Sequence, residues 1–345
     1  MKRIRSFPLL IALSVVFVGI VAMLIKFGIL NDYAAQILSL AGVNVIVALG
    51  LNLISGFTGQ LALGHAGFMA IGAYAAAASV MTFHLPIVVG ILIGGIITSL
   101  FGFVIGFPTL RLRGDYLAIV TLAFGEIIRV ILVNLDSLTG GAAGLKGIPY
   151  FVSAKAIAAN PEAIKNVPVL NFVWITLTVL VVLALVHNML HSSYGRAIIS
   201  IREDEVASNA MGVGIFKYKM IAFILSAFIA GIGGGLFAFL YNYLNPTDFN
   251  FLRSCDFLII VVFGGMGSLT GTLVAGYLLT YLQEALRFLQ DYRMVIYPLL
   301  LILMMIFRPG GIMGNREFSP TRLFRTGSLK RAMQRETAAD REEQA

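Results

Sequence analysis

Apolar runs of about twenty residues recur along the chain and restrict it to very few folds. They cover approximately residues 7–25, 34–54, 66–82, 86–107, 116–134, 171–190, 219–240, 256–270, 271–289 and 294–307. About 20 apolar residues are needed for an α-helix to cross the hydrocarbon core of a bilayer. Charged residues make up only 12% of the sequence, against about a quarter in soluble domains. We therefore expect an all-α polytopic membrane protein with about ten transmembrane helices.

The first apolar run follows Lys2, Arg3 and Arg5. It is longer than the apolar part of a secretory signal peptide, about 7–15 residues, and no small-residue cleavage site follows it. We expect it to remain as the first span, with the N-terminus inside.

The basic residues indicate the orientation of the chain. With the N-terminus inside, the inner segments carry Lys2, Arg3, Arg5, Arg111, Arg113, Arg196, Arg202, Lys217, Lys219 and seven further residues from Arg316 to Arg341. The outer segments carry Lys26, Lys146, Lys155, Lys165, Arg253 and Arg293. An excess of basic residues inside is typical of membrane proteins, so the net charge of +8 does not require nucleic acid as a partner. We expect a transmembrane domain over 1–314 and a polar cytoplasmic tail over 315–345, which could contact membrane lipid.

Two glycine-rich breaks interrupt the apolar runs at 53–72 and 263–276, and both contain G-x-x-G-x-L. Matching breaks in the two halves of a transporter indicate a binding site or path. Close helix contacts through small residues are the alternative interpretation. The candidate path residues are Gly56, Gly59, Gln60, Gly64, His65, Gly264, Gly265 and Gly267.

The longest polar interruption in the second half is YGRAIISIREDEVASNAMGVGIFKYK, residues 194–219, within a predicted inner loop at 191–219. Its pattern predicts a short helix with Ala197, Ile198 and Ile201 on one side and a charged stretch, 202–205, on the other. Amphipathic structure of this kind contacts a partner or lies at the membrane surface.

Two pairs of opposite charges lie inside predicted spans, Glu126 with Arg129 and Glu284 with Arg287. Residues three apart share a helix face. Intramembrane charges are functional candidates by default, but each acid here has a neighbouring base. The spacing therefore favours structural ion pairs over a proton relay.

Catalytic and metal-binding patterns are not apparent. The glycine-rich outer loop at 138–149 contains Lys146, but the phosphate-binding motif requires G-K-[ST] before a helix. The four histidines, His65, His84, His187 and His191, are scattered. We expect a chain that is not an enzyme and holds no metal or cofactor, and whose outer loop is available to a soluble delivery protein.

Six stretches carry a family resemblance that covers most of the chain. They are GFTGQLALGHAGFMAIGAY (56–74), RGDYLAIVTLAFGEI (113–127), TGGAAGLKGIP (139–149), the 194–219 loop, FGGMGSLTGTLVAG (263–276) and RPGGIMG (308–314). With them the chain resembles the LivM-type permeases of branched-chain amino-acid ABC importers. The resemblance implies uptake of branched-chain or related amino acids across the bacterial inner membrane. It also implies a LivH-like second permease, two separate ATP-binding subunits that hold ATP and Mg, and a periplasmic substrate-binding protein.

The resemblance further implies that the 194–219 loop contains a coupling helix that docks on an ATPase. The coupling residues would be Gly195, Arg196, Ala197, Ile201, Arg202, Glu203, Asp204, Glu205, Ala207, Met211 and Gly212. We expect small residues to allow close approach and Glu205 to fix the register. An ion-coupled secondary transporter is the alternative, but it would require an unpaired acid or an ion site at mid-membrane.

Overall fold

The computed structural model describes residues 31–112, 114–151, 167–287 and 310–314, with isolated residues between 19 and 25 and between 292 and 307. Six of its helices are long and apolar enough to cross a membrane. They are α2 (Asp32–Asn52, continued by a π-helical turn at Leu53–Phe57), α3 (His65–Phe83), α4 (Ile87–Thr109), α5 (Asp115–Asn134), α8 (Val167–His191) and α11 (Ile215–Tyr241). Six predicted spans are thus confirmed; those at 7–25 and 294–307 and the tail at 315–345 lie outside the described ranges.

Two shorter helices follow, α12 (Phe251–Gly264) and α13 (Leu269–Ala285), where the sequence predicted spans at 256–270 and 271–289. The predicted bounds are wrong for a local reason. The Asn250 side chain caps α12 and starts it at Phe251, and a residue with positive φ, Gly265, ends it. Its 14 residues rise only about 21 Å at 1.5 Å per residue, less than the core of about 30 Å. By itself α12 is too short to cross the membrane.

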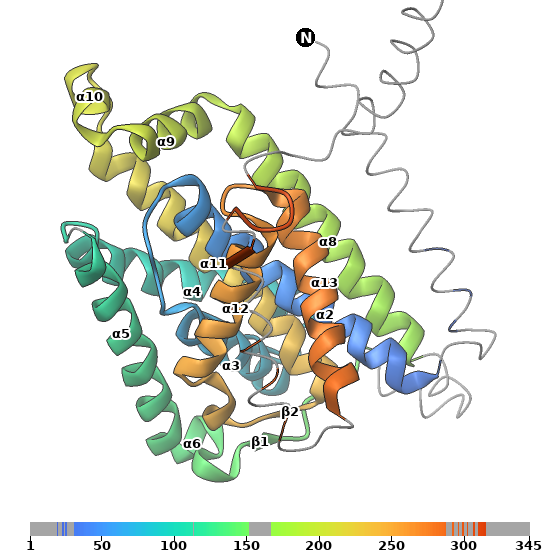
Figure 1. Ribbon diagram of the computed structural model, residues 1–345. Helices are drawn as coiled ribbons and strands as arrows, with labels where there is room; N and C mark the ends of the chain where they lie inside the picture. The colour runs from blue at the N-terminus through green and yellow to red at the C-terminus, as the bar shows by residue number, and fades with distance from the viewer. Residues whose placement is uncertain are drawn as a thin grey trace, which may run out of the picture.

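Helix α11 forms the centre of the bundle and packs mainly on α3, α4 and α2 (Figure 1). Most of α2, α3 and α11 is buried inside the protein, whereas α4, α5 and α8 are largely exposed. A helix that is apolar on all sides is normally buried in protein or in a membrane. The exposed apolar side chains of the outer helices, such as Phe103 and Ile127, therefore match a lipid environment.

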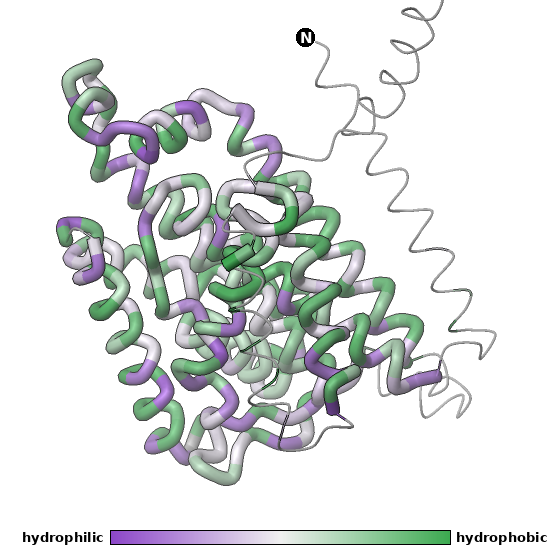
Figure 2. Tube along the Cα trace, in the orientation of Figure 1, coloured by the Kyte–Doolittle hydropathy of each residue, from purple (hydrophilic) through white to green (hydrophobic). Residues whose placement is uncertain are grey.

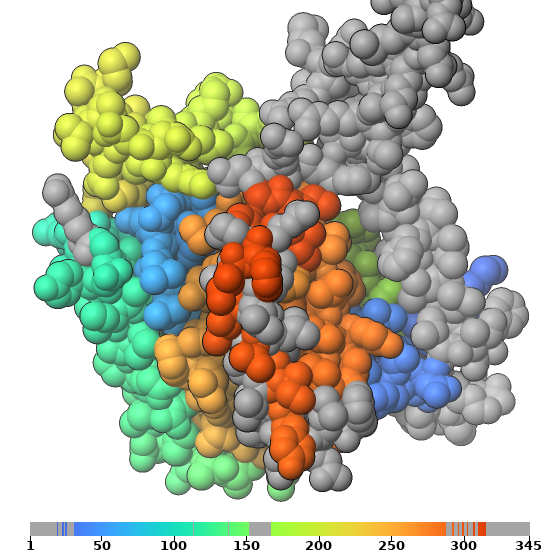
Figure 3. All heavy atoms as spheres, viewed as in Figure 1, coloured from blue at the N-terminus to red at the C-terminus, as the bar shows by residue number. Residues whose placement is uncertain are grey.

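Polar residues gather toward the two ends of the bundle (Figure 2). At one end, α9 (Ser193–Glu203) and α10 (Glu205–Ala210) project from the body (Figure 3). At the other end lie α6 (Asp136–Thr139), the 3-10 turns Gly141–Ala143 and Pro246–Phe249, and a two-stranded sheet. In that sheet β1 (Leu145–Lys146) pairs antiparallel with β2 (Tyr243–Leu244), with Leu145 opposite Leu244. The turn-rich 138–149 loop is thereby held against the end of α11.

Candidate functional site

The two glycine-rich breaks meet at the side chain of Asn52, which is completely buried at the end of α2. Its Oδ1 accepts a hydrogen bond from the Gly267 N–H at 2.9 Å. Its Nδ2 donates to the Ser268 carbonyl at 3.0 Å and to Thr272 Oγ1 at 2.8 Å. Non-helical backbone inside a membrane protein needs partners of this kind. One amide thus supplies them to three residues of the second break.

Two glycines make this contact possible. A Cβ on Gly56 would lie 1.8 Å from Asn52 Oδ1 and 2.4 Å from the Gly267 nitrogen. Gly267 itself has a φ of +89°, which side-chain-bearing residues rarely adopt. The breaks therefore lie backbone to backbone, as the interpretation of close contacts through small residues predicted. The other interpretation, a binding site or path at the breaks, stays a prediction.

The segment 310–314 covers the second break. The Ile312 N–H donates to the Phe263 carbonyl at 2.8 Å, and the Met313 N–H donates to the Gly264 carbonyl at 3.3 Å. A Cβ on Gly265 would lie 2.7 Å from the Gly314 carbonyl oxygen. Two of the candidate path residues, Gly264 and Gly265, are thus packed against this segment in the present conformation.

The first break divides its candidate path residues between two environments. His65, at the first turn of α3, is fully buried and its Nε2 lies 2.8 Å from Ser226 Oγ on α11. Gly64 lies against the backbone of Thr121 on α5. Gly59 and Gln60, in contrast, line a cavity. These two residues share that cavity with Ile201, Arg202 and Glu205 of the α9–α10 segment.

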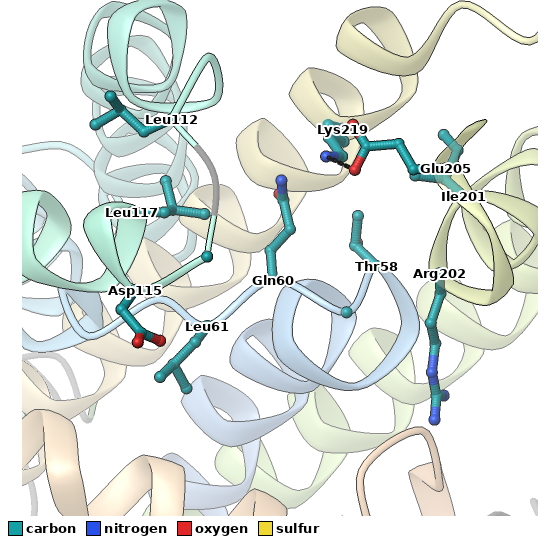
Figure 4. A pocket seen from close by; sticks show the side chains of 12 residues that line it. Thr58, Gln60, Leu61, Leu112, Asp115, Leu117, Ile201, Arg202, Glu205 and Lys219 are labelled. Atoms are coloured by element: carbon teal, nitrogen blue, oxygen red, sulfur yellow. Dashed lines mark hydrogen bonds and ion pairs between the residues drawn. The ribbon is translucent and has the colours of Figure 1, made fainter. Parts of the chain in front are cut away.

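That cavity has a volume of about 390 Å³ and lies between the first break, the start of α5 and the α9–α10 segment with the start of α11 (Figure 4). Thr58–Leu61 of the first break forms one wall, and the second consists of Leu112, Gly114, Asp115 and Leu117. The third comes from Ile201, Arg202, Glu205 and Lys219. Lys219, in the first turns of α11, donates to Glu205 Oε2 at 3.1 Å. The lysine side chain is 8% exposed and the glutamate 42%, so the pair ties α10 to α11 across the edge of the cavity.

Arg202 extends from the last turn of α9 to both breaks. A Cβ on Gly59 would lie 3.2 Å from Arg202 Cγ, and one on Gly267 would lie 2.6 Å from its Nη1. The stem of the arginine therefore packs on the first break and its guanidinium on the second.

The coupling candidates fall on two faces of α9 and α10. On the inner face, Gly195 and Ile201 are buried and Ala197 is half-buried. Arg202 contacts the two breaks and Glu205 binds Lys219, so these two side chains also point toward the bundle. The outward-facing set is Arg196, Glu203, Asp204, Ala207, Met211 and Gly212. Asp204 also caps α10, because its Oδ1 accepts from the N–H groups of Val206 and Ala207. Val206 and Met211 are 81% and 85% exposed, which leaves an uncovered apolar surface at the tip.

Both predicted charge pairs form ion pairs. Glu126 and Arg129 lie 2.7 Å apart, and Glu126 Oε1 also accepts from the Phe251 N–H at 2.9 Å. The acid of α5 therefore holds the start of α12. Glu284 and Arg287 lie 3.0 Å apart, and both bond the Tyr33 hydroxyl at the start of α2.

Sequence reasoning missed Asn52 and the role of Lys219 toward Glu205. Asn52 carried a detectable signal, since it is a polar residue inside an apolar run, and polar groups at membrane depth normally have a conserved partner or function. The partner of Lys219 lies 14 positions away across a loop, so local spacing did not indicate the pair.

The fold and the junction define a multi-pass helical membrane protein in which two helix breaks meet and an amphipathic loop contacts both. The family model described as "branched-chain amino acid transport system / permease component" matches residues 33–306. The chain therefore belongs to this family of transport permeases.

Individual relatives agree with the family assignment. The chain is 39% identical to the high-affinity branched-chain amino acid transport system permease protein LivM of Escherichia coli, over 81% of this chain and 69% of that protein. It is 38% identical to the LivM protein of Salmonella typhimurium, over 81% of this chain and 70% of the relative. The LivH permease of Escherichia coli is 25% identical, over 81% of this chain and 94% of LivH. No solved structure matches the chain.

Proposed function

We propose that the chain is one of two permease subunits of an ABC importer that moves branched-chain or related amino acids across the bacterial inner membrane. A LivH-like subunit would complete the path, and a periplasmic binding protein would deliver the substrate. Two separate subunits would bind ATP and Mg, and α9 and α10 would dock on one of them. The support comes from the family and from relatives whose names give this substrate class.

The single observation that carries the docking proposal is the two-sided arrangement of α9 and α10. Their inner face is joined to the permease through Arg202 and the Glu205–Lys219 ion pair. Their outer face exposes Val206 and Met211. Large exposed apolar side chains at a protruding tip suit a protein partner. Movement of that partner would reach both helix breaks through Arg202.

Within this arrangement the coupling residues take different roles. Ala207, Met211 and Gly212, with the polar Arg196, Glu203 and Asp204, form the surface for the ATPase. Gly195, Ala197 and Ile201 pack α9 onto the bundle. Glu205 fixes the register by binding Lys219 rather than the ATPase.

The test is co-purification with the ATP-binding subunits and ATP-driven uptake into vesicles. Ala207→Trp places a large side chain on the outer face, where it disturbs no buried contact. Val181→Trp is the matched control, because Val181 is 57% exposed in the middle of α8, away from both ends of the bundle. We expect the ATPase to be lost, or uptake to stop, in Ala207→Trp only. An Ala207→Trp complex that co-purifies and transports like the wild type would contradict the docking site, and uptake driven by an ion gradient without ATP would contradict the importer.

A further inference from the structure

A second cavity lies at the end of the bundle opposite α9 and α10, where α11 ends and α12 begins. Its volume is about 490 Å³, within the range of about 300–1,000 Å³ that is typical of small-molecule sites. It is lined by charged as well as apolar side chains. Figure 1 shows this end of the molecule beside β2.

One cation, Arg253, lies in the wall of this cavity. Its Nη2 donates to Asn44 Oδ1 on α2 at 3.0 Å. Its guanidinium also lies 5.3 Å from the centre of the Phe257 ring and 5.9 Å from that of Phe237. These contacts fix the orientation of the group. A guanidinium has five N–H donors, and the hydrogen bond to Asn44 is made by one of them.

Two carboxylates, Asp248 and Asp256, line the same cavity and interact with the charge of Arg253. Neither carboxylate has an oxygen within 4.0 Å of a guanidinium nitrogen of Arg253, the limit for an ion pair. The ion pairs among the described residues are Glu126–Arg129, Glu205–Lys219 and Glu284–Arg287. Partial burial raises the pKa of Asp248 above its ordinary value, and the nearby Arg253 acts in the opposite direction. The cavity thus presents one positive and two negative groups that do not neutralise each other by direct contact.

Tyr243, Thr247 and Asn250 add polar groups to the wall, and the rest of it is largely apolar. Leu40 comes from α2, Phe237 and Tyr241 come from the end of α11, and Leu252 comes from the start of α12. Partly buried charges are costly unless a partner of opposite charge or a hydrogen bond satisfies them. A ligand that carries a positive and a negative group on the same carbon atom, with an apolar remainder, would match both the charged and the apolar parts of the wall.

We propose that this cavity binds an apolar α-amino acid as a zwitterion. The guanidinium of Arg253 binds the carboxylate, Asp248 and Asp256 bind the ammonium group, and the side chain packs on Tyr241 and Leu252. The inference rests on the proposed function and adds to it a substrate site on the permease itself. It also places that site at the end of the bundle away from the α9–α10 loop, where a delivery protein would release its cargo.

The test uses the full chain purified with its partner subunits but without the delivery protein. Binding of radiolabelled leucine is measured by equilibrium dialysis, with leucinamide and N-acetylleucine as competitors. Leucinamide lacks the carboxylate and N-acetylleucine lacks the ammonium group. We expect each to bind the wild type at least about tenfold more weakly than leucine, the effect of losing one charge-assisted hydrogen bond.

Variants assign the two charges. We expect Arg253→Gln to weaken the binding of leucine about tenfold and to leave the binding of leucinamide unchanged. Asp256→Asn should weaken the binding of leucine and leave the binding of N-acetylleucine unchanged. Arg287→Gln is the matched control, because Arg287 is 64% exposed and does not line the cavity. The wild-type comparison of the three ligands stands even if a variant fails to fold.

Three results would overturn the site: equal binding of the three ligands, no effect of Arg253→Gln on leucine, or no leucine binding by a complex that transports leucine with ATP. In the last case the proposed function would stand. If the wild-type complex, supplied with ATP and delivery protein, takes up no amino acid, the proposed function fails and the site fails with it.

Discussion

The buried amide of Asn52 joins the two helix breaks, because its Oδ1 accepts a hydrogen bond from the Gly267 N–H at 2.9 Å. The two residues lie 215 positions apart in the chain. Through them the end of α2 and the start of α13 become one structural unit, and Arg202 lies against that unit. A transport cycle that moves the α9–α10 loop would act first on this unit.

Replacing Asn52 tests the junction directly. Asn52→Ala leaves the Gly267 N–H without its acceptor, and the Ser268 carbonyl and Thr272 Oγ1 without the amide donor. An unsatisfied buried polar group costs about 1–3 kcal/mol. We expect thermal unfolding in detergent at a clearly lower temperature and loss of uptake. Ser99→Ala is the control, since the Ser99 hydroxyl bonds only within its own helix. An Asn52→Ala variant as stable as the control would show that the junction contributes little.

Gly56 and Gly125 make a matched pair of buried glycines. A Cβ on Gly56 would overlap Asn52 Oδ1 at 1.8 Å, whereas one on Gly125 would meet its nearest atom at 3.7 Å. Gly56→Ala should therefore abolish activity and stable expression. Gly125→Ala should be tolerated, because alanine gains up to about 1 kcal/mol over glycine within a helix. Measurements of expression, unfolding temperature and uptake for both variants check this, and equal behaviour would contradict it.

The Glu205–Lys219 pair should respond unequally to removal of its two members. Glu205→Ala leaves the nearly buried ammonium of Lys219 without a partner, and an uncompensated buried charge is strongly destabilising. Lys219→Met removes that charge and leaves a half-exposed carboxylate in contact with water. We expect Glu205→Ala to lower the unfolding temperature more than Lys219→Met. The double variant should recover part of the loss, and a double variant worse than Glu205→Ala alone would contradict this account.

Arg202 should be needed for coupling rather than for ATPase docking. Arg202→Ala removes the contacts with Gly59 and Gly267 but leaves the outer face of α10 intact. We expect ATP hydrolysis to continue while uptake falls about tenfold or more, equivalent to about 1.4 kcal/mol. Lys217→Ala is the control, because that lysine is exposed at the start of α11 and belongs neither to the proposed docking surface nor to the cavity wall. Loss of ATPase binding in Arg202→Ala would instead assign the arginine to the docking surface.

The sequence by itself determined the class of fold, six of the spans, the position of both breaks and the segment that forms α9 and α10. These features depend on local properties, namely the length of an apolar run, the absence of side chains at glycines and the 3.6-residue period of an amphipathic helix. The two ion pairs, Glu126–Arg129 and Glu284–Arg287, followed from the same local rule, since their members lie three residues apart.

Tertiary structure alone decided which residues meet. Asn52 meets Gly267 only because helices distant in sequence pack side by side. The same holds for Asn44 and Arg253, which are separated by 209 positions in the chain. The same packing decided that Glu205 binds Lys219, while Ala207 and Met211 remain exposed. The physical reason is that an apolar membrane helix has no strong amphipathic signal to define its inner face, so its contacts depend on the shapes of all its neighbours.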